Sequence, residues 1–297
     1  MRKYLLVLLP LLVALASCNV GNRKMAVQEQ DSVKKFILQE VWRTDSVLRT
    51  PESVIYDKKR DILYVSNVNM EPRQKDGNGF ISRLDKSGNI TDLHWIDGLS
   101  GPKGMAIVGD TLFAADIDEI VAMDINKASI IRKIPVNGAR MLNDIASDSD
   151  GNLYISDTDA NKIHRYSAGK LQEWMAQGLL GPNGLLVMGD TLFLAAQGSN
   201  NFAAINIPDL TMKVVADSLQ HGDGIAYTGI PGYLLVTNWE GEIFMINPDF
   251  SKTMLLNTKQ QQTNTADIEF LQKEKLLLVP TFFKNCVIAF SLNEEKP

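Results

Sequence analysis

A sequence motif of two short apolar strands joined by a turn recurs along the chain, and its spacing restricts the fold more than any other feature. The first strand of the motif is marked by Ile145, Leu185 and Ile225 in three consecutive copies, so the repeat is 40 residues long. Each copy opens with a polar turn and carries a second apolar strand after a second turn, as in residues 153–156. Strand-rich repeats of this length indicate a β-propeller.

Three further copies of the motif complete the body of the chain. Their first strands are marked by Val54, Met105 and Ile268, which gives six units. A unit supplies about four short strands bounded by turn residues, but the sixth contains only three before the chain ends. We expect the apolar segment 36–42 to supply the missing strand, because this closes the ring and leaves no open sheet edge.

The predicted fold is therefore an all-β, six-bladed β-propeller over residues 35–293, with its last blade closed by an N-terminal strand. An open sandwich is the alternative, but a sandwich does not require six matched units.

The N-terminal residues have the pattern of a secretion signal. Arg2 and Lys3 precede an apolar run, residues 4–15, that is too short to span a bilayer comfortably. The run ends in Leu15-Ala16-Ser17-Cys18, which resembles a bacterial lipobox, where small residues precede a cysteine that becomes lipidated. An ordinary secretory peptide cleaved nearby is the alternative.

These residues predict a lipoprotein signal peptide over 1–17, a lipidated Cys18 and a polar tether over 18–34. Asn19 follows the cysteine, and it favours an anchor in the outer membrane that faces the periplasm. Cleavage would leave Cys286 without a cysteine partner for a disulfide. Because Cys286 lies in an apolar segment, we expect it to be a small buried hydrophobic residue.

Composition and motifs exclude several classes of function. The net charge of −5 gives no basic surface for nucleic acid. The three histidines are scattered without the spacing of a zinc site. Neither the Gly-x-Ser-x-Gly turn of serine hydrolases nor a glycine-rich phosphate loop occurs. We expect a monomer that takes a small-molecule substrate and meets the membrane only through its lipid anchor.

Polar residues recur at the position two before each strand marker. The first strand of every unit in a propeller lines the central channel, so side chains at one position of the repeat converge around the axis. In chain order these residues are Glu52, Lys103, Asn143, Asn183, Asp223 and Ala266. Their oxygen donors suit a hard or borderline divalent cation, with water completing its shell. Capping of local turns is the alternative for each residue taken singly.

Four of these residues carry a resemblance to a known family. Glu52, Asn143, Asn183 and Asp223, in this order and on these units, resemble the metal-binding quartet of the SMP-30/gluconolactonase/LRE family, whose members are regucalcin-like six-bladed propellers. The resemblance covers residues 36–292. It implies a divalent cation in the channel, with Ca²⁺ as the first expectation and Zn²⁺, Mg²⁺ or Mn²⁺ as alternatives, and hydrolysis of a lactone.

The resemblance also implies roles for individual residues. The cation would polarise the lactone carbonyl and lower the pKa of a bound water, and Asp223 is the candidate to accept the proton of that water. Gly222 departs from the family, in which proline is common at this position.

Lys103 is the second catalytic candidate, because an ammonium group here would stabilise negative charge on the substrate. Its alternatives are to neutralise the carboxylates in place of a metal or to point outward into solvent.

A second set of polar residues ends the second strand of four units. Its members are Asn67, Asp116, Asp157 and Asn238. They are candidates for substrate contact at the mouth of the channel, although turn capping is the favoured alternative. The polar insertion 67–78 that follows the first of them is a candidate lid.

The leading hypothesis from sequence is a metal-dependent hydrolase of the SMP-30/gluconolactonase type, acting on a lactone or related small sugar derivative in the bacterial cell envelope. The competing hypothesis is a non-catalytic, NHL-like propeller that binds a protein or glycan, because propellers serve both purposes.

Overall fold

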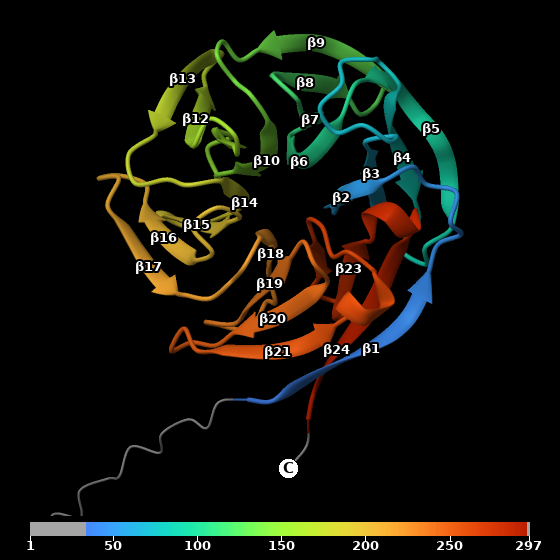
Figure 1. The fold of residues 1–297 in the computed structure, drawn as a ribbon. Coiled ribbons are helices and arrows are strands. Elements are labelled where there is room, and N and C mark those ends of the chain that lie inside the picture. Colours follow the sequence, from blue (N-terminus) through green and yellow to red (C-terminus); the bar gives the residue numbers. More distant parts are fainter. Residues whose placement is uncertain (1–33, 296–297) are drawn as a thin grey trace, which may run out of the picture. The chain divides into compact units, whose positions relative to one another are not determined.

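Each repeat unit of the sequence folds into one four-stranded antiparallel sheet. In the computed structural model, which describes residues 34–295, six such sheets surround a central axis (Figure 1). The predicted six-bladed β-propeller is confirmed. The predicted signal peptide, the lipidated Cys18 and the tether up to residue 33 lie outside the described residues.

The strands follow the chain in order from the axis outward. The first sheet contains β2 (Pro51–Asp57), β3 (Ile62–Asn67), β4 (Gly79–Leu84) and β5 (Ile90–Leu99). The second contains β6 (Pro102–Val108), β7 (Thr111–Asp116), β8 (Glu119–Asp124) and β9 (Ser129–Pro135). The third contains β10 (Leu142–Ser147), β11 (Leu153–Asp157), β12 (Lys162–Ser167) and β13 (Lys170–Met175).

The next two sheets repeat this order. The fourth contains β14 (Pro182–Met188), β15 (Thr191–Ala196), β16 (Phe202–Asn206) and β17 (Met212–Ala216). The fifth contains β18 (Gly222–Tyr227), β19 (Leu234–Asn238), β20 (Glu242–Ile246) and β21 (Lys252–Asn257).

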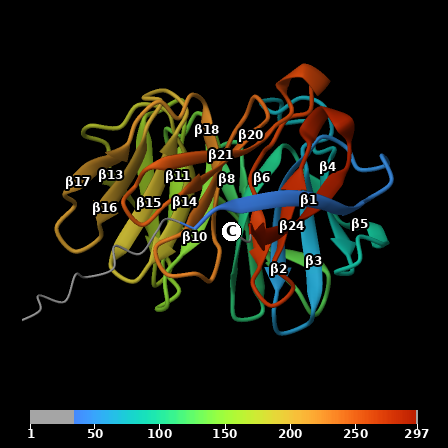
Figure 2. The same cartoon turned by 90° about the horizontal axis from the view of Figure 1, so that it is seen from below.

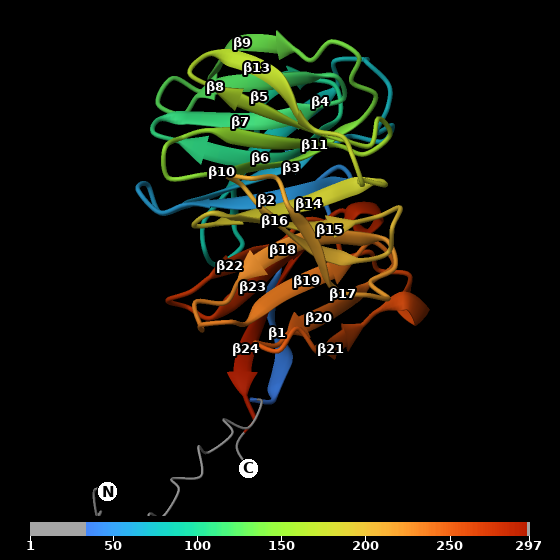
Figure 3. The same cartoon turned by 90° about the vertical axis from the view of Figure 1, so that its left-hand side faces the viewer.

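The sixth sheet joins the two ends of the propeller. It contains β22 (Glu269–Leu271), β23 (Leu276–Pro280), β24 (Val287–Glu294) and, as its outermost strand, β1 (Phe36–Arg43). β1 pairs antiparallel with β24, and Phe36 lies opposite Glu294. Figure 3 shows the two strands side by side. The outer edge of β24 is thus covered by the N-terminal strand.

Two 3₁₀ helices interrupt the loops of the last two sheets. They are η1 (Lys259–Gln261) and η2 (Phe282–Lys284), and Figure 2 shows them at the same end of the ring. No helix among residues 34–295 is long and apolar enough to cross a membrane.

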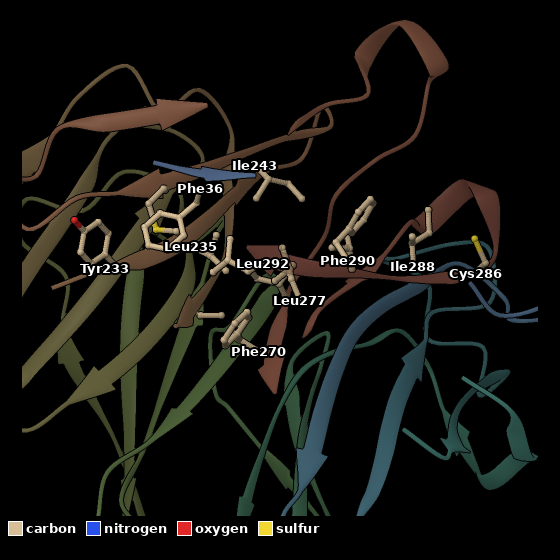
Figure 4. Close-up of a cluster of buried hydrophobic side chains, with 14 residues drawn as sticks. Phe36, Tyr233, Leu235, Ile243, Phe270, Leu277, Cys286, Ile288, Phe290 and Leu292 are labelled. Carbon is tan, nitrogen blue, oxygen red and sulfur yellow. The ribbon is translucent and has the colours of Figure 1, made fainter. Parts of the chain in front are cut away.

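The core consists of apolar clusters between neighbouring sheets. In the cluster drawn in Figure 4, Phe36 of β1 packs edge-on against Tyr233, with ring centroids 5.3 Å apart. Leu235 and Phe290 belong to the same cluster, so the fifth sheet, the sixth sheet and the N-terminal strand share one core. Cys286 is buried in it as a free cysteine, which confirms the prediction of a small hydrophobic residue.

The inner strands approach one another so closely that three positions have no room for a side chain. A Cβ atom at Gly104 would overlap the carboxylate of Asp144, and one at Gly184 would overlap the backbone oxygen of Asp223. A Cβ atom at Gly224 would collide with the backbone of Asp267 and Ile268, directly before β22. None of these three glycines has a positive φ, so the requirement is for space and not for a special conformation.

Replacing Gly184 with alanine should therefore strain the axis. We expect Gly184→Ala to lower the free energy of unfolding by about 3 kcal/mol, because the neighbouring group is backbone and cannot turn aside. Denaturant unfolding followed by circular dichroism measures the change. Gly109→Ala is the control, since no atom lies within 4 Å of its added Cβ. Its positive φ alone should cost about 1 kcal/mol. Equal losses in both variants would contradict the close approach.

Candidate functional site

The polar residues two before the strand markers come together at one end of the channel. A cavity of about 310 Å³ is lined there by Glu52, Lys103, Asn143, Asn183 and Asp223. None of these five residues is more than 5% exposed. The sixth residue of the position, Ala266, is fully buried. The structure thus brings together the four predicted metal ligands and both predicted catalytic residues.

A local irregularity of the inner strands positions these side chains. In the fourth sheet Pro182 pairs with Ala196 and Leu185 pairs with Leu194, so Asn183 and Gly184 together oppose a single residue. The same shift occurs at the corresponding place in the other four inner strands that carry cavity residues. Such β-bulges turn a side chain away from the regular pleat. In five of the sheets the β-bulge lies at the residue that lines the cavity.

Several oxygen atoms that line the cavity accept no hydrogen bond from the protein. Oε2 of Glu52 is buried without a hydrogen bond. Among residues 34–295 no donor reaches the carboxylate of Asp223 or the side chain of Asn183. Nδ2 of Asn143 donates to Oγ1 of Thr158 (3.2 Å), whose hydroxyl donates to the carbonyl of Pro182 (2.8 Å). This chain fixes the amide of Asn143 and leaves its oxygen free.

Burial and mutual repulsion perturb the two carboxyl groups. Burial raises the pKa of Glu52 well above its usual range, and the charges of Asp223 and Asp267 add to the increase. Burial also raises the pKa of Asp223, with Asp267 as the second cause. Within residues 34–295 no three His, Cys, Asp or Glu side chains gather at a potential metal site. The candidate set therefore relies on amide oxygens as well as on carboxylates.

Lys103 is buried in the cavity wall and does not reach solvent. Its ammonium group donates to the carbonyls of Pro72 (3.1 Å) and Gly101 (3.0 Å), and it forms no direct ion pair among the described residues. Burial lowers its pKa, while the charge of Glu52 opposes that change. The alternative in which Lys103 points outward into solvent is therefore wrong.

The insertion after β3 reaches over this cavity. Its residues Met70, Pro72 and Arg73 line the cavity, and Lys103 holds the carbonyl of Pro72. Arg73 pairs with Asp159 of the third sheet, and Lys75 pairs with Asp118 of the second at 2.5 Å. These ion pairs hold a loop of the first sheet against the second and third sheets, as expected for a lid.

The second set of predicted residues has a different place. Oxygens of Asp116 accept hydrogen bonds from the backbone N–H groups of Ser100 and Gly101. Asp157 accepts equivalent bonds from Arg140 and Met141. Oδ1 of Asn67 accepts the corresponding bond from Arg49, whereas Oδ1 of Asn238 accepts a bond from Glu242 of the next strand. None of the four lines the cavity, and their hydrogen bonds match the turn-capping alternative.

Several apolar residues of the cavity have no role predicted from the sequence. Met141, Phe282 and Phe283 line it together with Trp239 and Met70. Phe282 and Phe283 lie in the connection after β23, at the same point of the sixth unit as the insertion in the first. A comparison of these connections across all six units would have found them.

A second cavity, of about 390 Å³, opens at the other end of the channel. It is lined by Asp144, Asp267 and Glu269 among others. Both oxygens of Asp144 accept backbone hydrogen bonds at 2.6 Å, from Ile145 and Leu185. Ser53 donates to Asp267 at 2.6 Å. Unlike the carboxylates of the first cavity, these have protein partners.

Fold and site together define a class: a six-bladed β-propeller with an oxygen-lined axial cavity under a loop. No protein-family model matches the sequence, and no curated protein matches it. Solved structures do match the fold. A putative gluconolactonase is 14% identical with a TM-score of 0.64, over 89% of this chain and 95% of its own.

Two other solved structures show the same fold. A gluconolactonase from Xanthomonas campestris is 14% identical with a TM-score of 0.63, over 83% of this chain and 87% of its own. A catalytically inactive virginiamycin B lyase from Staphylococcus aureus, with quinupristin, is 16% identical with a TM-score of 0.62, over 86% and 99%. Gluconolactonases therefore share this fold, in agreement with the resemblance seen in the sequence. At such identities the chemistry is argued from the site.

The stability of the propeller should fall as the pH rises toward neutrality. Burial raises the pKa of Glu269 from 4.5 to about 7 and that of Asp267 to about 6. The folded state then keeps protons that the unfolded state releases, so the free energy of unfolding falls between pH 4.5 and about 7. We expect Glu269→Gln to flatten this dependence in denaturant titrations. Asp45→Asn, at an exposed site, is the control. An unchanged slope in Glu269→Gln would contradict the assignment.

Lys103 should hold the insertion in place. We expect Lys103→Met to speed amide exchange of residues 69–78 at least about tenfold, because a hydrogen bond from a charged donor contributes about 1.5–3 kcal/mol. Hydrogen exchange followed by mass spectrometry measures this. Lys59→Met is the control, since it removes an exposed ion pair with Asp110. Unchanged exchange in Lys103→Met would mean that the ion pairs of the insertion hold it alone.

Proposed function

We propose that this chain is a metal-dependent hydrolase of the SMP-30/gluconolactonase type that opens a lactone or a related small sugar derivative. The observation that carries the proposal is the cavity in which Glu52, Asn143, Asn183 and Asp223 converge. Its most telling atom is Oε2 of Glu52, which is buried and without a hydrogen bond. A buried, unpaired carboxylate oxygen is costly unless a ligand satisfies it.

The donor set fits a divalent cation. The two carboxylates and two amide oxygens are hard ligands of the kind that Ca²⁺, Mg²⁺ and Mn²⁺ prefer, and Zn²⁺ accepts carboxylates as well. A cation would offset the repulsion between Glu52 and Asp223 that raises the pKa of Glu52. Glu52, Asn143, Asn183 and Asp223 would hold it, with Ca²⁺ as the first expectation. When bound, the cation supplies Lewis acidity toward a carbonyl oxygen and toward water.

Two residues have proposed parts in the chemistry. Asp223 is the proposed proton acceptor, since its carboxylate lies among the residues that would hold the cation and a water bound to it. Lys103 has three N–H donors and uses two of them on the carbonyls of Pro72 and Gly101. Its third N–H is proposed to donate to a substrate oxygen on which negative charge develops.

The place of action is part of the proposal. The apolar run at residues 4–15 and Cys18 support a lipoprotein of the bacterial cell envelope, anchored in the outer membrane and facing the periplasm. A small lactone that enters this compartment would reach the cavity without crossing the inner membrane.

Substitution of the proposed ligands tests the function. We expect Asp223→Asn and Glu52→Gln to weaken cation binding by more than about 100-fold, because even outer-shell partners of a metal are worth about 10–100-fold. Calorimetric titration with Ca²⁺, Mg²⁺, Mn²⁺ and Zn²⁺ measures binding, and a pH-stat assay with a lactone panel measures hydrolysis. Both variants should lose hydrolysis as well.

Asp190→Asn is the matched control, because this carboxylate is exposed in the turn between β14 and β15. A folded wild-type protein that binds none of the four cations and opens no lactone would contradict the proposal. That outcome would favour the non-catalytic, NHL-like propeller.

A further inference from the structure

The two most exposed large apolar side chains among residues 34–295 line the same cavity. Met70 is 68% exposed and Phe283 is 63% exposed. Met70 comes from the insertion after β3, and Phe283 comes from η2 in the connection after β23. Exposed apolar side chains that gather at the mouth of a cavity indicate a ligand that covers them.

Phe283 belongs to a packed aromatic cluster. Phe282, which is 4% exposed, lies edge-on to both neighbours, with ring centroids 4.6 Å from Trp239 and 4.9 Å from Phe283. Trp239 and Phe283 are 6.2 Å apart. These T-shaped contacts are favourable between aromatic rings. The cluster therefore presents a preformed apolar wall.

The backbone around this wall is held in unusual conformations. Phe282 has a φ of 48° and Met70 a φ of 94°, both in the region that disfavours side chains with a Cβ. The connection after β23 is secured by Asn285, whose Oδ1 accepts a hydrogen bond from the N–H of Thr50 at 2.9 Å. Met70 is secured by its own N–H, which donates to Oγ1 of Thr50 at 2.9 Å. Such conformations persist where the surroundings determine them, and they often occur at ligand sites.

Three of the polar side chains that line the cavity are engaged by the protein, at least in part. Arg73 is paired with Asp159, and two N–H groups of Lys103 are used by backbone carbonyls. The amide nitrogen of Asn143 is bound to Thr158. Those hydroxyl groups of a ligand that lie against the apolar wall would lack hydrogen-bond partners there, which is unfavourable.

We propose that the substrate of this site is an amphipathic lactone, in which an alkyl or aryl substituent accompanies the ester ring. The substituent packs against Trp239, Phe282, Phe283, Met70 and Met141, while the ester faces the carboxylates and amides on the cavity floor. This inference rests on the proposed hydrolase function. The volume of about 310 Å³ lies at the lower end of the range of about 300–1,000 Å³ for small-molecule sites, so a single ring with one short chain fits.

Two lactones with the same six-membered ring test the inference. δ-Decalactone carries a pentyl chain, whereas D-glucono-1,5-lactone carries hydroxyl groups. We expect the wild-type protein to hydrolyse δ-decalactone with a kcat/KM at least tenfold higher. Phe283→Ala should lower that value at least fivefold, mainly through KM, and should change the value for D-glucono-1,5-lactone less than twofold. Because Phe283 is exposed, the variant should fold normally, which circular dichroism checks.

Phe250→Ala is the matched control. Phe250 is 37% exposed, and it lies in the turn after β20. That strand starts at Glu242, shortly after Trp239 of the cavity, and ends at Ile246, so the turn is at the opposite end of the sheet. Phe250→Ala should leave both substrates unaffected.

The outcomes separate the inference from the proposed function. A preference for D-glucono-1,5-lactone, an equal loss for both lactones in Phe283→Ala, or the same loss in Phe250→Ala would overturn the inference while leaving the hydrolase proposal standing. If neither these two nor any other lactone of the panel is hydrolysed and no cation binds, the hydrolase proposal fails. Calorimetric titration with δ-decalactone then decides: binding to the wild type that Phe283→Ala weakens at least fivefold supports the apolar subsite, and no binding overturns it.

Discussion

The close approach of the inner strands at the axis is the constraint on which the site depends. Gly104, Gly184 and Gly224 lie where the backbone of one blade touches the next, and no side chain fits there. A residue directly before each of them occupies a β-bulge and turns into the space above this contact. This contact between the three glycines and the next blade is the waist of the channel. Tight packing at the waist and convergence of side chains at the mouth are thus two results of one backbone arrangement.

The waist also separates two groups of acidic residues that have different environments. Asp144 and Asp267, toward one end, accept hydrogen bonds from the protein. Glu52 and Asp223, toward the other end, lack them. Satisfied buried polar groups rigidify a core, whereas unsatisfied ones are expensive and call for a ligand. The same residue types therefore act as structural supports on one side of the waist and as candidate ligands on the other.

Much of this arrangement could be predicted from the sequence, because it follows from periodicity. The 40-residue step between Ile145, Leu185 and Ile225 predicts the blades, and equal phase predicts that Glu52 and Asp223 meet. Features that depend on loop conformation could not be predicted. The hydrogen bond from Lys103 to Pro72 and the packing of Trp239 against Phe282 arise from contacts between residues distant in sequence. Asp116 and Asp157 were ambiguous in the sequence, since a turn cap and a mouth residue have the same composition.

The pairing of β1 with β24 has a consequence for biogenesis. Phe36 lies opposite Glu294, so the partner of β1 is synthesised long after β1 itself. Contacts between such distant residues make folding slow. Until β24 has been synthesised, β1 has no partner and the sixth blade is incomplete, and such unpaired strand edges are prone to aggregate. The ring therefore closes only once β24 is present, and a chain that stops before β24 would leave β1 unpaired.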